Sequence, residues 1–545
     1  MKKTKNDNYK ISKKDFIVAL IIMLLYAFVS FYKLGNMKSP NTFYNNKKNN
    51  TIIVDLHGSQ FINTIKIFNG VRASDYTIYI SEDGNEYDYL RSISKNTVFS
   101  WDILPVTCKA RYLKIDFLGE TSVGEIGLYN NNSKLISGTY YNSKFDRITS
   151  LNDEKELLPK AKSYMNSTYF DEIYFARTAY EYVYNLKIYE WTHPPLGKII
   201  QAIPIYITHY MSPFNYRLMG NISGILLVGV MYFFGVILFK KKRYGIISSL
   251  LMCLDTFHFA HTRMGTVDSH LVLFITLSIL FMYIFTTNNK IRYLLLSGIF
   301  FSLSISVKWT GLYSGIALAI IYFIYLFKNK QINIKFICLG STFFVLIPII
   351  IYLSIFIIFS NNYYKTNNIS NIIKENQLMY NYHSKLNAKH NYSSSWYTWP
   401  ISYKPVMYHN IKYINGVENI SGVGNLIIWI GGFIGLIYCI IKFIKKKDKI
   451  ALLLIICSLS LWLPYMFIGR IMFLYHYFPV LPFIFLSLVY LINDIDNHFN
   501  IKYSFVPIII FSYIFFVIYY PAVSGSITNN NYHNYVELFD SWHFT

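Results

Sequence analysis

Long apolar runs recur along most of this chain, with short polar segments between them. A helix needs about 20 mostly apolar residues to cross the hydrocarbon core of a bilayer. Eleven runs approach this length, at residues 15–33, 216–239, 245–262, 267–286, 291–307, 310–327, 335–359, 424–444, 450–469, 472–493 and 503–521. The pattern therefore predicts a polytopic α-helical membrane protein with about 11 transmembrane helices.

Basic residues between the runs predict how these helices are oriented. Lys and Arg cluster before the first run and in short loops such as 240–243 and 445–449, and loops of this kind face the cytoplasm under the positive-inside rule. Residues 34–215, 361–423 and the tail from 522 are then extracytoplasmic. The first run lacks a clear cleavage site, so we expect it to be retained. The expected location is the plasma membrane.

The segment 40–130 has the pattern of β-strands. Residues 76–80 and 111–117 alternate polar and apolar positions, and Asp83-Gly84 is a turn signal. We expect a β-sandwich inserted in the first extracytoplasmic loop. Residues 79–84, 111–115 and 124–129 resemble the discoidin, or coagulation factor 5/8 type C, domain. This resemblance implies a carbohydrate or lipid headgroup as ligand, and a role as a spacer or packing module stays open.

The remaining boundaries follow from these two patterns. Residues 170–187 have the spacing of an amphipathic surface helix, and an apolar, interfacial helix is expected at 196–210. The expected parts are the N-terminus with the first helix (1–39), the sandwich (40–130), a connector with a juxtamembrane catalytic loop (131–215), a transmembrane core (216–360), an outer loop (361–423), the last transmembrane helices (424–521) and an outer tail (522–545).

Charge and cysteine usage exclude some function classes. The formal net charge of +22 would suit nucleic-acid binding, but much of it lies in the short loops, where membrane orientation explains it. We therefore expect no nucleic-acid partner. Four of the five cysteines lie in apolar runs, and no Cys/His spacing is typical of a zinc site. The sequence indicates neither a disulfide framework nor a metal site.

Ionisable residues gather at the helix ends opposite the Lys-rich loops. A charge embedded in a bilayer is costly and is a functional candidate by default. Asp171 and Glu172 open the expected surface helix, where acids can stabilise the helix N-terminus. A carboxylate there could also deprotonate a hydroxyl nucleophile as a general base. We therefore predict an extracytoplasmic active site with Asp171 and Glu172 as its catalytic candidates.

Several cations accompany this acidic pair. Each alone could be a headgroup anchor that reaches the interface, but together they suit the oxyanion of a lipid phosphate. Asp268 could orient a cation or a sugar hydroxyl, or form a salt bridge with Arg263. The predicted residues for donor phosphate and sugar are His193, Lys198, Arg217, Arg263, Asp268, Lys308, Arg470 and His476.

The outer loop is rich in Tyr, Asn and Trp. Its residues Trp396, Tyr397 and Trp399 could stack on a sugar or on an acceptor peptide. The alternative is an aromatic belt at the membrane interface.

Four segments together resemble the protein O-mannosyltransferase family, namely residues 170–175, 192–198, 306–311 and 475–479. The resemblance implies the GT-C fold, a polyprenyl-phosphate sugar donor and inverting transfer to Ser/Thr hydroxyls. It places Asp171 at the family's catalytic acidic position, with Glu172 as its neighbour and Arg217 near the donor. The 361–423 loop is too short for the MIR repeats of eukaryotic members, so a bacterial-type member is expected.

The leading hypothesis is an inverting glycosyltransferase that moves a sugar, expected to be mannose, from a lipid carrier to secreted or surface proteins. One alternative acceptor is a lipid or a cell-wall glycan. An alternative of another class is a glycolipid transporter or flippase. Apart from the donor no cofactor is required, and participation of a divalent cation with Asp171, Glu172 and Asp268 stays open.

Overall fold

The computed structural model describes residues 9–544 except 47, 49, 96, 364 and 387. The basic residues 2, 3 and 5, which contribute to the expected orientation, and the last residue of the expected tail lie outside the described residues. The chain divides into two compact units. We call residues 33–185 with 202–217 the sandwich unit, and residues 1–32, 186–201 and 218–545 the helical unit.

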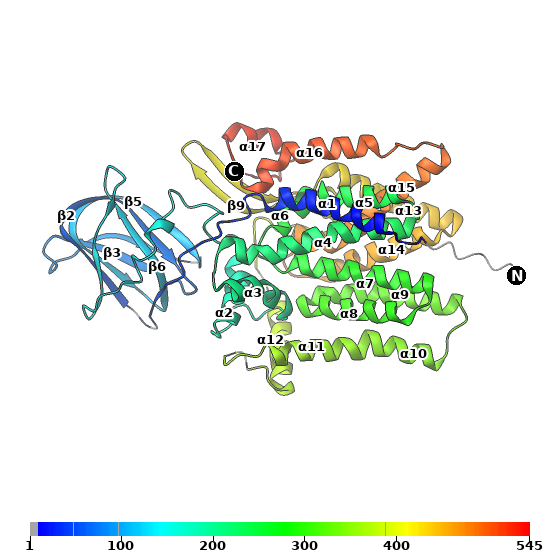
Figure 1. The fold of residues 1–545 in the computed structure, drawn as a ribbon, viewed down its shortest axis with the longest axis horizontal. Helices are drawn as coiled ribbons and strands as arrows, with labels where there is room; N and C mark the ends of the chain where they lie inside the picture. The colour runs from blue at the N-terminus through cyan, green and yellow to red at the C-terminus, as the bar shows by residue number, and fades with distance from the viewer. Residues whose placement is uncertain are drawn as a thin grey trace. The chain divides into compact units, whose positions relative to one another are not determined.

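Nine helical segments within the described residues are long and apolar enough to cross a membrane. Each coincides with an expected run to within a few residues, and the chain is a multi-pass α-helical membrane protein (Figure 1). The nine are α1 (Lys13–Phe31), α4 (Pro213–Phe239), α7 (Asp268–Asn288), η2 with α9 (Trp309–Gly311, Leu312–Lys328), α10 to α11 (Ile334–Ser341, Ile347–Ile358), α13 (Leu426–Lys446), α14 with η5 (Lys449–Trp462, Leu463–Phe467), η6 with α15 (Leu474–Val480, Leu481–His498) and α16 (Val506–Ser524).

The other two expected spans differ from this group, so the count of eleven is not confirmed. α8 (Ile291–Val307) is apolar but has only 17 residues. The run 245–262 was wrongly expected to be one helix, because it is divided into α5 (Lys242–Cys253) and α6 (Thr256–Thr262). Asp255 interrupts it by capping α6, where its carboxylate accepts the His258 N–H at 2.9 Å, and it also accepts the Trp429 indole N–H at 2.8 Å.

The segment 361–423 is more ordered than an outer loop would suggest. It contains α12 (Ile369–Lys385), the 3₁₀ helix η4 (Trp396–Ile401) and the hairpin β9 (Val406–Tyr413) and β10 (Gly416–Gly422). β10 also pairs with β11 (Ile527–Thr528) of the tail, which continues into α17 (Asn530–Val536). The tail is therefore tied to this segment by a small antiparallel sheet.

An antiparallel sheet forms most of the sandwich unit, as the alternating pattern predicted. Its described strands are β1 (Tyr44–Asn46), β2 (Asn50–Asn69), β3 (Tyr76–Ser81), β4 (Asp88–Ile93), β5 (Ser100–Phe117), β6 (Thr121–Tyr129), β7 (Leu135–Ile136) and β8 (Thr139–Asn142). The main order is β1-β6-β2-β5-β3-β4. β7 and β8 extend the sheet past residue 130, into a stretch expected to be loop. Inward side chains such as Ile65, Leu113 and Ile115 are fully buried in its core.

Two shorter helices are found where the sequence predicted them. α2 (Glu172–Val183) follows the sandwich, and α3 (Leu196–Thr208) follows the Pro-Pro break. Just before α2, the Thr168 hydroxyl donates to the carbonyl of Val98. Glu172 accepts the Tyr169 N–H at 3.1 Å, so an acid stabilises the start of α2.

Candidate active site

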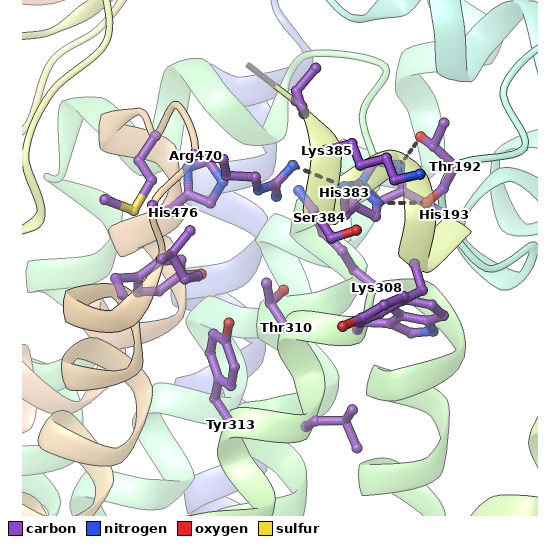
Figure 2. Close-up of a pocket in the computed structure, with 18 of the residues that line it drawn as sticks. Thr192, His193, Lys308, Thr310, Tyr313, His383, Ser384, Lys385, Arg470 and His476 are labelled. Carbon is purple, nitrogen blue, oxygen red and sulfur yellow. Dashed lines mark hydrogen bonds between the residues drawn. The ribbon is translucent and has the colours of Figure 1, made fainter. Parts of the chain in front are cut away.

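A cavity of about 740 Å³ opens among the helix ends of the helical unit (Figure 2). α8 ends at its edge and η2 begins there, while η5 ends and η6 begins on the opposite wall. The other ends of α8 and α14 carry basic loops at 288–290 and 445–449. The cavity thus lies at the helix ends away from these loops, and four of the predicted residues line it: His193, Lys308, Arg470 and His476.

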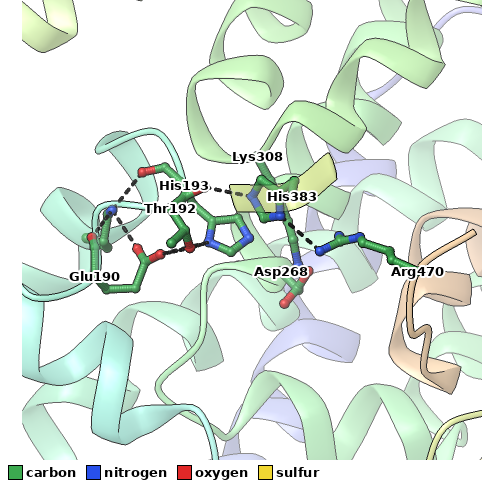
Figure 3. Close-up of polar contacts among 8 residues, drawn as sticks. Glu190, Thr192, His193, Asp268, Lys308, His383 and Arg470 are labelled. Atoms are coloured by element: carbon green, nitrogen blue, oxygen red, sulfur yellow. Dashed lines mark hydrogen bonds and ion pairs between the residues drawn. The ribbon is translucent and has the colours of Figure 1, made fainter. Parts of the chain in front are cut away.

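Glu190 organises the segment that brings His193 to the cavity (Figure 3). The Lys198 ammonium donates to the Glu190 carboxylate and to the backbone oxygens of Glu190 and His193, each at 2.7 Å. The His193 Nδ1–H donates to the same carboxylate at 2.9 Å, and the Thr192 hydroxyl also donates to it. Lys198 is only 1% exposed, so it fixes this segment. It does not present its charge to the cavity, although the sequence had suggested a role at the donor phosphate.

Close packing and electrostatics keep this segment in place. A Cβ at Gly197 would lie 2.6 Å from Val267 Cγ1, so glycine allows residues 192–198 to approach the start of α7. Burial alone would raise the pKa of Glu190, but Lys198 and His193 hold it well below its usual range. Burial lowers the pKa of His193. The result is an ionised Glu190 that orients a neutral His193 at the cavity wall.

Asp268 positions Lys308 at the base of the cavity. The Lys308 Nζ donates to Asp268 Oδ1 at 3.0 Å, and the other carboxylate oxygen lies 3.7 Å from His261 Nε2. The expected alternative partner, Arg263, is elsewhere. Its guanidinium donates to the carbonyls of Ser30 and Tyr32 at 3.0 and 2.9 Å. Arg263 therefore stabilises the carboxyl end of α1, and it does not belong to the lining of this cavity.

Aromatic rings hold His476 on the opposite wall. Its Nδ1 lies 3.0 Å from the Phe473 carbonyl oxygen, and its ring stacks on Tyr475 and Trp399 with centroids 4.7 and 6.1 Å apart. Trp399 is 0% exposed, so its expected role in stacking on a sugar or acceptor is wrong. It supports His476 instead.

The two other aromatic candidates differ in exposure. Trp396 is half-buried and packs edge-on against Trp462, with centroids 5.7 Å apart. Tyr397 is 66% exposed. Of the three predicted stacking residues, Tyr397 therefore presents the most free ring surface.

His383 of α12 joins two walls of the cavity. Its Nε2 lies 2.8 Å from the Thr192 carbonyl oxygen, and its Nδ1 lies 2.9 Å from Arg470 Nη1. Its ring packs edge-on against His193 at 5.2 Å. Burial, together with the nearby charge of Arg470, lowers the pKa of His383 to about 4. A neutral His383 thus connects the 192–198 segment to the turn that carries Arg470.

An apolar groove of about 500 Å³ shares Trp309 and Leu312 with the cavity. It runs between α8, α9, α11 and α12. At its edge the Trp309 indole donates to the Tyr352 hydroxyl at 3.1 Å, and that hydroxyl donates to Asn376 at 2.6 Å. A polar cavity and an apolar groove thus meet at Trp309.

In the sandwich unit, Glu172 and Arg217 form a fully buried ion pair. The carboxylate accepts two guanidinium hydrogen bonds, at 2.6 and 2.8 Å. The remaining Arg217 donors go to the carbonyls of Leu34, Tyr164 and Ser167. All five N–H donors of Arg217 are therefore used, and this geometry contradicts the expected roles of Arg217 at the donor phosphate and of Glu172 in catalysis. Asp171 is half-buried at the first turn of α2.

Two of the three carboxylates considered for a divalent cation are engaged in ion pairs. Glu172 is paired with Arg217, and Asp268 with Lys308. Among the residues that the structure describes, no three His, Cys, Asp or Glu side chains come together as metal ligands.

Two residues of the site were missed by sequence reasoning. Glu190 lies three residues before His193 and eight before Lys198, and an acid so close to a basic motif could have suggested the pairing. His383 lies in a Tyr- and Asn-rich stretch that gave no comparable signal. Its position depends on how α12 packs, which the local sequence does not determine.

Three family models match parts of this chain. Residues 161–364 match the family described as dolichyl-phosphate-mannose-protein mannosyltransferase. Residues 368–542 match the C-terminal four-transmembrane region of protein O-mannosyltransferase, and residues 35–131 match the F5/8 type C domain. Both resemblances read from the sequence are therefore confirmed.

Individual relatives are distant. Dolichyl-phosphate-mannose–protein mannosyltransferase 4 of Candida albicans is 23% identical over 220 residues, which are 34% of this chain and 29% of the relative. The matched region thus spans under a third of that relative's length.

One solved structure shares the fold. The S. cerevisiae protein O-mannosyltransferase Pmt1-Pmt2 complex bound to the sugar donor superposes with a TM-score of 0.61 at 14% identity. The match covers 69% of this chain and 89% of that one. With the two family matches on either side of residue 366, the chain belongs to the protein O-mannosyltransferase family.

Proposed function

We propose that this protein is a glycosyltransferase that moves a sugar from a polyprenyl-phosphate carrier to Ser/Thr hydroxyls of secreted or surface proteins. The observation that carries the proposal is the cavity where Lys308 and Arg470 meet three histidines at the helix ends. Family membership supports this reaction class, and mannose is the sugar that the family description names.

Donor chemistry explains why such a cavity needs cations. When the bond between the sugar and the phosphate breaks, negative charge grows on the lipid phosphate. Positive groups fixed in a site with little water stabilise that charge without having to reorganise. Lys308, held by Asp268, and Arg470, held by His383, are oriented in this way. The phosphate leaves as a stabilised anion, so the reaction requires no general acid.

The apolar groove is the proposed place of the lipid chain. It joins the cavity at Trp309 and Leu312, so a donor whose phosphate lies near Lys308 could extend its first isoprene units between α9 and α11. Burial of apolar surface stabilises such binding by about 25 cal/mol per Å². The polar head and apolar tail of one donor therefore match two adjoining features of the helical unit.

Asp171 is the proposed general base, with inversion at the sugar carbon. A serine or threonine hydroxyl is a weak nucleophile near neutral pH, and a positioned carboxylate raises its reactivity. The buried pair with Arg217 occupies the Glu172 carboxylate, so we favour Asp171 as the base of the two. Tyr397 remains a candidate contact for the acceptor because its ring is exposed.

The basic loops support an orientation with the cavity facing outward, and the plasma membrane is the proposed location. The F5/8 type C domain is proposed to bind a carbohydrate.

A single experiment tests the proposed reaction. Purified protein is mixed with a synthetic polyprenyl-phosphate mannose and a Ser/Thr peptide, and the peptide is analysed by mass spectrometry and NMR. The proposal expects one hexose on a hydroxyl with inverted anomeric configuration. Transfer only to a lipid or glycan acceptor, or no transfer, would contradict it.

A further inference from the structure

One face of α12 lines both parts of the proposed donor site. Ile372, Ile373 and Asn376 face the groove, whereas Tyr380, His383 and Ser384 face the cavity. Residues three and four apart lie on the same side of a helix, so these six positions form one continuous stripe. α12 therefore forms a wall that the groove and the cavity share. Within this stripe, His383 is the residue that accepts a hydrogen bond from a cationic side chain of the cavity, Arg470.

The hydrogen-bond partners of His383 determine its tautomer. The Thr192 carbonyl oxygen can only accept, so the proton is on Nε2, and the Arg470 guanidinium can only donate, so Nδ1 is an acceptor. Protonation of Nδ1 would remove this acceptor and place two cations side by side. The geometry thus requires a neutral imidazole between the Thr192 carbonyl and Arg470.

A neutral partner has a different effect on Arg470 than a carboxylate would. Asp268 orients Lys308 and also compensates its charge at 3.0 Å. His383 orients the Arg470 guanidinium but carries no negative charge. In the described part of the chain, the side-chain partner found for Arg470 is this imidazole and not an acid. The full positive charge of Arg470 can therefore act on an anion in the cavity that it lines.

We propose that His383 is a positioning residue that aims Arg470 into the donor cavity while leaving the Arg470 charge uncompensated. This inference rests on the proposed function, because it takes the donor phosphate as the anion. It assigns His383 no contact with the reacting atoms. The imidazole acts through Arg470 and through its anchor on the Thr192 carbonyl.

The inference distinguishes three substitutions of His383. Leu removes both hydrogen bonds, so Arg470 is released and the KM for the donor should rise about tenfold to a hundredfold, the effect of one lost hydrogen bond to a charged group. Gln offers an amide oxygen to Arg470 and an amide N–H to Thr192, and it should restore the KM to within about threefold of the parent. Glu also orients Arg470 but neutralises it, so the KM should stay about tenfold or more above the parent.

The experiment measures kcat and KM for polyprenyl-phosphate mannose with the full-length purified protein and a Ser/Thr peptide. Gln377→Ala, at an exposed position of α12 outside the groove and the cavity, is the matched control and should behave like the parent. Melting temperatures verify that each variant is folded. His383→Leu is also made in an Arg470→Ala background, where it should raise the KM less than twofold further, because coupled residues are not additive.

The outcomes separate this inference from the proposed function. If the parent protein does not use the donor, the proposed function fails. If the parent is active and His383→Leu matches it, the positioning role is overturned. The role is also overturned if His383→Gln is as impaired as His383→Leu at equal melting temperature, or if His383→Leu has its full effect without Arg470. Recovery in His383→Gln but not in His383→Glu supports it.

Discussion

Glu172 and Arg217 form a bidentate ion pair in which both side chains are 0% exposed, with N···O distances of 2.6 and 2.8 Å. The acid comes from the first turn of α2 and the arginine from the start of α4. Arg217 also binds three backbone carbonyls. One side chain therefore ties together the segments at Leu34, 164–172 and α4, which makes the pair a structural centre of the sandwich unit.

Arg217→Ala should destabilise the protein by about 3–5 kcal/mol, because removal of one partner leaves a buried, uncompensated charge. Glu172→Gln should have a similar though smaller effect. Thermal unfolding of both variants and of the double variant checks this. The double variant should be less destabilised than the sum of the single changes. If Arg217→Ala has a normal melting temperature but binds the donor more weakly, the structural role is contradicted and Arg217 acts in the donor site.

Asp171→Asn should lower turnover by about 10²–10⁴, the usual contribution of a general base, with little change in donor affinity or in melting temperature. The substitution keeps the shape of the side chain and removes its basicity. Steady-state kinetics with the synthetic donor provide the test. Turnover near the parental rate would mean that Asp171 is not the general base and only places a charge at the start of α2.

Lys308→Gln should raise the KM for the donor by at least about tenfold, because it removes a charge from the proposed phosphate site. Asp268→Asn should have the same direction of effect, since Lys308 loses the carboxylate that holds it at 3.0 Å. The double variant should have a KM for the donor that is little higher than that of either single variant. Additive effects would indicate that Asp268 acts on the sugar and not through Lys308.

The membrane core could be predicted because length and hydropathy alone indicate spanning helices. The break at Asp255 could not be predicted, because it depends on partners such as Trp429, 174 residues away.

The roles of the cationic residues could be predicted only in part from their residue type. Lys308 and Arg470 line the cavity. Lys198 and Arg217 instead form ion pairs with buried carboxylates of the protein. A cation that binds a ligand and one that binds backbone carbonyls look the same in a sequence.

Acid should weaken the contribution of His383 to stability. Its pKa is held at about 4 in the folded protein, below the ~6.5 of an unfolded chain. The unfolded state therefore binds more protons between these values, and stability is complete above about pH 6.5 and falls as the pH drops towards 4. His383→Gln lacks this proton uptake. The difference in melting temperature between parent and variant should change from pH 7 to pH 5 in favour of the variant, and a constant difference would contradict this.

Cysteines placed at Asn166 and Lys385 should react with an impermeant thiol reagent in intact, wall-stripped cells, and one at Lys446 should not. The prediction follows from the basic loops. A background without the five native cysteines is needed, because Cys338 is exposed. Labelling only at Lys446 would reverse the orientation and place the cavity in the cytoplasm.

The central claim is that the cavity beside Lys308 and Arg470 binds the phosphate of a lipid-linked sugar. Equilibrium binding of polyprenyl-phosphate mannose to the parent protein, Lys308→Gln, Arg470→Ala and Gln377→Ala tests it most directly. We predict that each cavity variant binds the donor at least about tenfold more weakly, whereas Gln377→Ala binds it like the parent. Equal affinity in all four proteins, with all four folded, would contradict the account.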